Sequence, residues 1–267
     1  MNDPASPASE VGLPRTLLAA TVLPPVIALS AILALWEAYV RLRDVKGYLL
    51  PPPSDVFRAL AEEPGRYASA AVTSLTAAVG GLVVASLVAF GLAVLMAHSR
   101  LLERAIYPPA LLVKVTPIVA LYPLLAIWFG FGIGPKVAIA ALITFFPMLV
   151  NAAVGLRSVD PQALDALRVL AASRWEVFRR LRFPSSLPYV FAALRISVPL
   201  SLVGAVVAEF LSGSSGMGQL ILIANGAFDT PALFAAVFVL AALGVSLTGL
   251  VGYVERRVLD WHVSTGA

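Results

Sequence analysis

Six long apolar stretches constrain the fold of this chain more than any other feature. Each is about 20 residues or longer, the length at which an α-helix crosses the hydrocarbon core of a bilayer, and each carries few charged residues. Together they predict an all-α polytopic membrane protein with about six transmembrane helices. The expected spans are 16–40, 68–97, 106–129, 137–156, 190–211 and 231–254.

Composition agrees with a chain that lies mostly in lipid. Charged residues make up 13% of it and hydrophobic residues 60%, whereas soluble domains average about 25% charged residues. The segments between the spans are too short and scattered to form a soluble domain, so we expect a single transmembrane domain over 16–255. We expect 1–15, rich in Pro, Ser and Ala, to be a disordered cytoplasmic N-terminus and 256–267 a cytoplasmic tail.

The arginines predict the orientation in the membrane. Between 157 and 182 there are six arginines against three acidic residues, and further pairs of arginines lie at 100 and 104 and at 256 and 257. Because cytoplasmic loops are rich in Lys and Arg, we expect these segments and the N-terminus to face the cytoplasm. Only 41–67, which has basic residues of its own, blurs the pattern. The net charge of +4 then needs no nucleic-acid partner, since no basic surface interleaved with aromatic residues is present.

Several function classes find no support in the sequence. The chain has no cysteine, and its two histidines, His98 and His262, match no metal spacing. A phosphate loop of the G-x-x-x-x-G-K-S/T type is also missing. A secondary transporter is the alternative to an ATP-driven one, but we find no convincing internal repeat of the kind such proteins usually show. An intramembrane enzyme would need a paired constellation of reactive side chains, and none is visible. We therefore expect no cofactor or metal on this chain.

The segment 160–184 is the longest polar interval in the second half of the chain, and we call it the elbow. Asp160 followed by Pro161 is a typical helix start. Ser173 with Glu176 three residues later predicts a capping box that begins a second short helix, and Pro184 is expected to end it. Both arms are amphipathic, which fits either a helix pair resting on lipid headgroups or a docking surface for a cytoplasmic partner.

The elbow resembles the EAA motif of importer-type ATP-binding-cassette permeases, which runs E-A-A, three residues, G, nine residues, I-x-L-P. Asp165-Ala166-Leu167 occupies the place of E-A-A, Ala171 that of the glycine, and Leu181 and Phe183-Pro184 those of I and L-P. Further segments that resemble the family's pattern follow in the same order along the chain. They are LLPPPS at 49–54, the proline-rich 117–132, PYVFA at 188–192, AVVAEFL at 205–211 and GSSGMGQL at 213–220.

The resemblance implies the importer (MetI-like) permease fold, with a cytoplasmic coupling helix between helices 4 and 5, in the bacterial inner membrane. It further implies a second permease copy, most simply a homodimer, and an extracytoplasmic substrate-binding protein. ATP and Mg²⁺ would be bound by separate ATPase subunits, so this chain would be a transport subunit and not an enzyme. The residues that would couple it to the ATPase are Asp165, Ala166, Ala171, Arg174, Trp175, Phe178, Arg179, Leu181 and Pro184.

Three positions depart from the motif: Asp165 replaces Glu, Leu167 replaces the second Ala, and Ala171 replaces Gly. Asp165 keeps the negative charge on a shorter side chain. Ala171 lacks the glycine's freedom to adopt a positive φ, so a left-handed turn there would be strained.

Candidate pathway or gate residues are Lys114, Pro117, Pro123 and Glu209. Lys114 is either a lysine that snorkels near the cytoplasmic end of its span or a cation that lines the path. Glu209 is either part of an outer gate or binding-protein contact, or a helix-end carboxylate held by loop donors such as Ser212 or Ser214. Expected contacts with the binding protein are Pro52, Ser54, Ser214 and Asp229.

The substrate is the least constrained part of the prediction. The matching branch of the family includes importers of nitrate, taurine, sulfonates and bicarbonate, and also riboflavin, thiamine-precursor and aromatic-acid systems. Few fixed charges lie in the spans, which favours a small organic nutrient over a bare oxyanion.

Overall fold

The computed structural model describes residues 15–260, with side chains from residue 23 onward. Residues 1–14 and 261–267 lie outside the described part, and so does most of the expected N-terminal segment. Within the described part every regular element is helical, which confirms the all-α prediction. The elements are α1 (Arg15–Leu42), α2 (Pro53–Glu62), α3 (Pro64–His98), α4 (Arg100–Val115), α5 (Ile118–Phe129), α6 (Gly134–Gly155), α7 (Pro161–Val169), α8 (Arg174–Val177), the π-helical turn η1 (Phe178–Arg182), α9 (Phe183–Ser212), α10 (Met217–Gly226) and α11 (Thr230–Val258).

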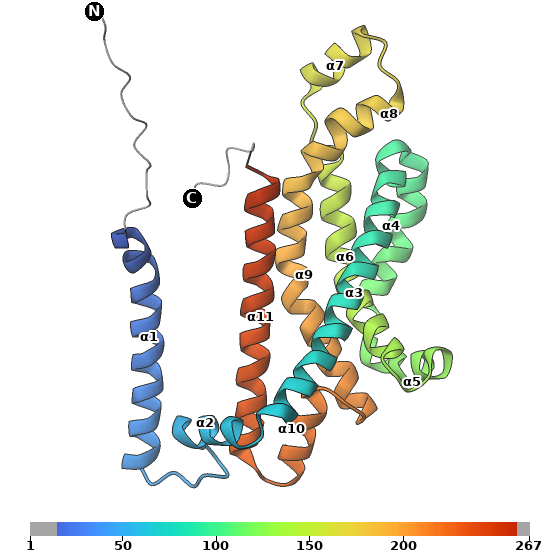
Figure 1. Cartoon of the computed structure of the whole chain (residues 1–267). Coiled ribbons are helices and arrows are strands. Elements are labelled where there is room, and N and C mark those ends of the chain that lie inside the picture. The colour runs from blue at the N-terminus through green and yellow to red at the C-terminus, as the bar shows by residue number, and fades with distance from the viewer. Residues whose placement is uncertain (1–14, 261–267) are drawn as a thin grey trace, which may run out of the picture.

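Five of these helices are long and apolar enough to cross a membrane, and α4 with α5 form a sixth candidate that bends by 101°. The number of spans predicted from the sequence is therefore confirmed, but the third span is broken. The elbow, α7 and α8, lies at one end of the molecule, and α2, α5 and α10 lie at the other (Figure 1).

The break in the third span falls at Thr116-Pro117. Pro117 has no N–H to donate and disfavours a helical conformation in the residue before it, and Thr116 is extended, with φ −69° and ψ 132°. Pro108, Pro109 and Pro123 remain inside helices. Of the four prolines expected to interrupt this span, only Pro117 ends a helix.

Small residues bring α3, α6 and α9 together in the centre of the protein. A Cβ placed on Gly81 of α3 would lie 2.5 Å from the Cβ of Ala140 in α6, and one on Gly204 of α9 would lie 2.8 Å from the Cα of Ala140. The backbones therefore approach closely, as expected where van der Waals packing drives helix association in lipid. At Gly91, another glycine of α3, an added Cβ would have no neighbouring atom within 4 Å, so no close helix contact requires a glycine there.

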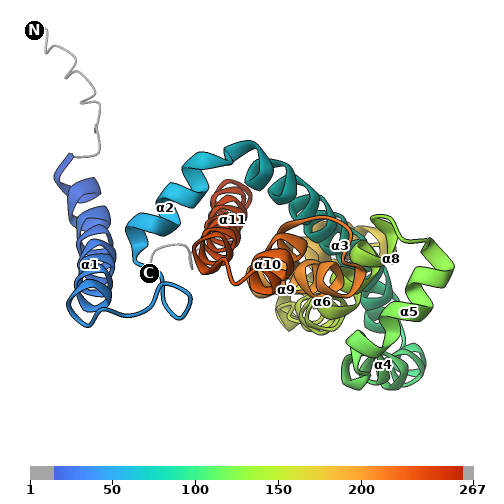
Figure 2. The same ribbon diagram turned by 90° about the horizontal axis from the view of Figure 1, so that it is seen from below.

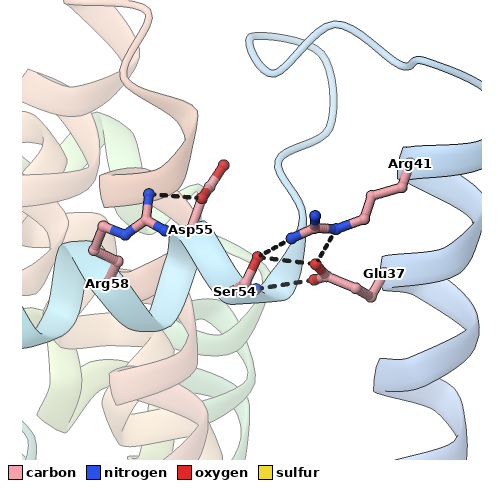
Figure 3. A network of polar contacts seen from close by, with 5 residues as sticks. All are labelled: Glu37, Arg41, Ser54, Asp55 and Arg58. Carbon is pink, nitrogen blue, oxygen red and sulfur yellow. Dashed lines mark hydrogen bonds and ion pairs between the residues drawn. The ribbon is translucent and has the colours of Figure 1, made fainter.

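Helix α1 stands apart from the central helices along most of its length (Figures 1 and 2). Near its C-terminal end the Trp36 ring lies 5.5 Å from that of Phe234 in α11. Beside it, the Glu37 carboxylate accepts hydrogen bonds from the backbone N–H of Ser54 at 3.0 Å and from the Arg41 Nε at 2.6 Å (Figure 3). A side chain of α1 thus caps the N-terminus of α2.

Helix α2 needs this contact because it lacks a local cap. Helix α2 begins at Pro53, with Pro52 at the N-cap position and no side-chain cap of its own. Ser54 therefore lies inside the first turn, and its hydroxyl donates to Glu37 at 2.9 Å. Since proline supplies no capping oxygen, the acceptor comes from another helix.

Candidate functional site

Helix α7 forms the outer arm of the elbow. The Asp160 carboxylate caps it, accepting from the Gln162 N–H at 2.9 Å, and Pro161 opens its first turn, which confirms the predicted start. None of its residues is buried. Of its apolar stripe, Leu164 and Leu167 are half-buried and Leu170 is 76% exposed, so the stripe is only partly covered within this chain.

The turn after α7 is left-handed at Ala171, which is the conformation in which an alanine is strained. Ala171 has φ +54°, a left-handed value that costs an alanine about 1–2 kcal/mol relative to the right-handed helix. The Ala171 N–H donates to the Arg168 carbonyl at 2.9 Å and the Ala172 N–H to the Leu167 carbonyl at 3.0 Å. These two bonds form a Schellman motif, so Ala171 makes the turn in which a glycine would be unstrained.

The inner arm begins as predicted and ends differently. Ser173 and Glu176 form the capping box, but α8 continues through the η1 turn directly into α9. The predicted helix end at Pro184 is wrong, and so is the separate fifth span beginning at 190. Pro184 lies in the first turn of α9, directly after η1. In η1 the hydrogen bonds are wider, of the i→i+5 type, such as the bond from the Phe183 N–H to the Phe178 carbonyl. This bonding replaces the α-helical bonds that a proline would break.

Two aromatic rings connect the surface of the elbow to the core. Trp175 is 65% exposed and stacks on Phe178, with ring centroids 5.6 Å apart. Phe178 in turn contacts the rings of His98 and Phe183, each at 6.2 Å. Among the other predicted coupling residues, Asp165, Ala166, Ala171, Arg174 and Arg179 are exposed, and Leu181 and Pro184 are half-buried.

Two arginines at the roots of the elbow bind the C-terminal end of α3. Arg157, just after α6, donates to the Met96 carbonyl at 2.6 Å and to both carboxylate oxygens of Glu103 at 2.6 and 2.8 Å. Arg182, just before α9, donates to the Ala97 carbonyl at 3.0 Å. Sequence reasoning counted these arginines only as positive charge, because no local pattern indicates partners so distant along the chain.

Lys114 of α4 lies beside the middle of α6. Its Nζ is 4.8 Å from the ring centroid of Phe146, in the middle of α6, and the Tyr107 ring lies 6.0 Å from the same ring. Phe146 is nine residues from the elbow end of α6, or about 14 Å at 1.5 Å per residue. Lys114, Pro117 and Pro123 are exposed in the single chain.

Glu209 is enclosed at the other end of the protein. Its side chain is fully buried, its carboxylate accepts from the Gly218 N–H at 2.8 Å, and the Ser74 hydroxyl lies 2.8 Å from both of its oxygens. The helix-end interpretation fits this geometry, although the donors are not the expected Ser212 and Ser214. A Cβ on Gly216 would overlap the Glu209 carboxylate, so glycine is required there.

Lys136 completes this buried polar cluster of the α9–α10 turn. It is 1% exposed, and its Nζ donates to the carbonyl and hydroxyl oxygens of Ser215 at 2.8 and 2.7 Å. The Met217 N–H donates to Ser74 at 2.9 Å. The turn is thus fixed from α3 and α6, through Ser74 and Lys136, which sequence reasoning did not select.

The four residues expected to meet a binding protein all lie at the end opposite the elbow, but most are engaged within the chain. Ser54 is bonded to Glu37, Asp229 caps α11 by accepting from the Ala232 N–H at 3.1 Å, and Ser214 lies 3.2 Å from the Ser212 hydroxyl. Pro52 is half-buried. In the described part of the chain no group of three or more His, Cys, Asp or Glu residues could hold a metal ion.

Comparison with known proteins adds independent findings. Residues 81–260 match the model of the family described as "Binding-protein-dependent transport system inner membrane component". The riboflavin transport system permease protein of Chloroflexus aurantiacus is 37% identical over 242 residues, which cover 89% of this chain and 90% of the relative. The formylaminopyrimidine transport permease protein of Halalkalibacterium halodurans is 32% identical over 90% of this chain and 96% of the relative. The taurine transport system permease protein of Escherichia coli is 27% identical, with 88% of each covered.

Proposed function

Since this chain belongs to the family of binding-protein-dependent inner membrane components, the importer-type ATP-binding-cassette permeases, we propose that its elbow is the surface on which an ATPase subunit docks. The observation that carries the proposal is an amphipathic arm, partly exposed on its apolar side, beside an exposed tryptophan. Helix α7 buries none of its residues, and Trp175 is held outward by its stacking on Phe178. Exposed apolar groups arranged in this way mark an interaction site. The comparisons give no support to a transporter that works without an ATPase.

The elbow is connected to the spans by elements that transmit a displacement. Its inner arm continues into α9 without a break in the helix, so a rigid-body movement of α8 moves the elbow end of α9 with it. Arg157 and Arg182 tie both roots of the elbow to the last carbonyls of α3. Docked ATPases would therefore rock α3 and α9 together, which is the kind of motion that opens a transporter to alternate sides.

In this proposal the elbow end faces the cytoplasm, as its excess of arginine suggests, and the N-terminus lies on the same side. ATP and Mg²⁺ are bound by the ATPase subunits. The binding protein meets the opposite end, where α2 and the turns flanking α10 lie (Figure 1). A second copy of the permease completes the transmembrane path.

We place that path along α4. This helix carries a stripe of polar side chains, Arg104, Tyr107 and Lys114. All three are exposed in the described part of the chain. An ionisable side chain at membrane depth normally faces a water-filled cavity or another protein surface, so this stripe suits a path between two permease copies. Glu209 is not included, because it is enclosed and hydrogen-bonded within the chain.

For the substrate we propose a planar nitrogen heterocycle. The relatives named for riboflavin and formylaminopyrimidine are 37% and 32% identical to this chain, whereas those named for sulfonates and taurine are 29% and 27% identical. The rings of Tyr107 and Phe146 beside Lys114 could stack on a flat ring while the ammonium group binds its carbonyl oxygens. A sulfonate is the second candidate, favoured by the single positive charge of Lys114.

The docking proposal is tested with Trp175→Ala in the permease reconstituted with the ATPase subunit and binding protein of its own organism. Loss of a central aromatic contact typically weakens an interface by about 2 kcal/mol, so we expect ATPase co-purification and ATP hydrolysis stimulated by the loaded binding protein to fall together. Trp128→Ala is the matched control, since Trp128 is also 65% exposed but belongs to α5, at the other end (Figure 1). Unchanged co-purification and hydrolysis in Trp175→Ala would refute the docking surface.

Uptake of labelled riboflavin compared with taurine tests the substrate class separately.

A further inference from the structure

A basic cavity of about 320 Å³ lies between the elbow and the C-terminal end of α3. Its polar lining consists of His98 from the end of α3, Arg168 from α7, Arg174 from α8 and Arg182 from η1. Apolar atoms of Leu164 and Val177 complete the wall, and none of the lining residues is acidic. Three guanidinium groups thus surround one cavity without a neutralising carboxylate in its lining.

These guanidinium groups have donors to spare. Arg174 forms no side-chain hydrogen bond or ion pair with any residue in the described part of the chain. Arg182 uses Nη1 on the Ala97 carbonyl, and Arg168 uses Nη1 on the exposed carboxylate of Asp165. Because each guanidinium carries five N–H donors, all three arginines can still bind an anion. Planar donors of this kind match the oxygens of a phosphate group.

The position of the cavity favours a lipid as the source of the phosphate. Ala97 and His98, which line it, are the last residues of the apolar helix α3, so we place the cavity near the membrane surface. Leu164 and Val177 add apolar surface beside the charges, as a phospholipid needs for its glycerol and first methylene groups. Basic pockets at this level of membrane proteins are suited to acidic headgroups.

We propose that this cavity is a binding site for the phosphate headgroup of an acidic phospholipid such as phosphatidylglycerol. The bound phosphate would bridge Arg168 of the outer arm to Arg174 and Arg182 of the inner arm. It would thereby hold the two arms at a fixed angle across the strained turn at Ala171. The site rests on membrane placement and on the cavity itself, and it does not require the docking of an ATPase.

The test is native mass spectrometry of the purified full-length permease, equilibrated with phosphatidylglycerol or with phosphatidylcholine of the same acyl chains. We expect phosphatidylglycerol to be retained in preference to phosphatidylcholine. The double variant Arg168→Gln/Arg174→Gln should weaken retention about fivefold for each charge removed. The control is Arg256→Gln/Arg257→Gln at the end of α11, which removes the same charge from outside the cavity. Circular dichroism verifies that each variant is folded, and Arg174→Gln alone serves if the double variant is not.

Each remaining outcome is informative. Equal retention of the two lipids, or an equal loss in the control pair, would overturn the site, since either would show only non-specific attraction to charge. Displacement of phosphatidylglycerol by millimolar inorganic phosphate would show that the cavity takes free phosphate and not a lipid. A separate co-purification of the cavity variant with the ATPase distinguishes the two roles. A variant that kept its lipid but lost the ATPase would place the arginines on the docking surface instead. Because the lipid assay contains the permease alone, its failure leaves the docking proposal untouched.

Discussion

Two of the turns in which a residue has positive φ are stabilised in opposite ways. At the α9–α10 turn Gly216 has φ +102° and lies against the buried Glu209 carboxylate, which Ser74 and Gly218 hold in place. At the elbow Ala171 has φ +54°, is exposed, and is held by two backbone hydrogen bonds. The chain therefore fixes one turn completely from within, whereas it leaves the other exposed at the surface where we expect a partner to bind.

Removing the internal anchor should have the largest effect. Glu209→Ala leaves the Gly218 N–H and the Ser74 hydroxyl without their buried acceptor, and we expect the free energy of unfolding to fall by about 3 kcal/mol. Thermal unfolding of the full-length protein in detergent measures the change. Glu209→Gln retains an acceptor oxygen and should lower the free energy of unfolding clearly less than Glu209→Ala. Wild-type stability in Glu209→Ala would show that this cluster does not hold the turn.

A smaller loss of stability is expected when an arginine at the root of the elbow is replaced. Arg157→Gln removes the hydrogen bonds to Glu103 and to the Met96 carbonyl, but the ion pair is 38% and 35% exposed, so solvent screening limits the cost to about 1 kcal/mol. A double-mutant cycle with Glu103→Gln measures the interaction directly. We expect Arg157→Gln to cost less once Glu103 has been replaced. Strict additivity would mean that the arginine stabilises α3 without the glutamate.

The smallest predicted effect is a gain in stability at the elbow. Ala171→Gly relieves the left-handed strain and should slow hydrogen exchange of the Ala172 amide, with a stabilisation of about 1 kcal/mol at most. Ala166→Gly, in the middle of α7, is the matched control and should be destabilising by a similar amount. If both substitutions shifted exchange in the same direction, left-handed strain at Ala171 could not be the reason.

The features predicted correctly from the sequence are governed by near neighbours. Asp160 caps α7, and Ser173 and Glu176 form the capping box, because each depends on residues within one helical turn. The helix end expected at Pro184 is wrong because the turn before it is π-helical. The wider bonding of η1 replaces the α-helical bonds that the proline would break, so the inner arm continues as one helix with α9.

Most of the partners that sequence reasoning missed are distant along the chain. Ser74 lies 135 residues from Glu209, Arg157 is 54 residues from Glu103, and Lys136 is 79 residues from Ser215. No periodicity relates such positions, and only the packing of elements distant along the chain brings them together. The contact of Lys114 with the Phe146 ring, which belongs to another helix, was missed for the same reason.

The Glu37 cap on α2 also bears on how the protein is made. The acceptor for the Ser54 N–H lies 17 residues earlier in the chain, so it is synthesised before the segment that it caps. Arg41 holds that carboxylate from the same helix. The contact involves only α1 and the start of α2, so its formation requires none of the helices that follow.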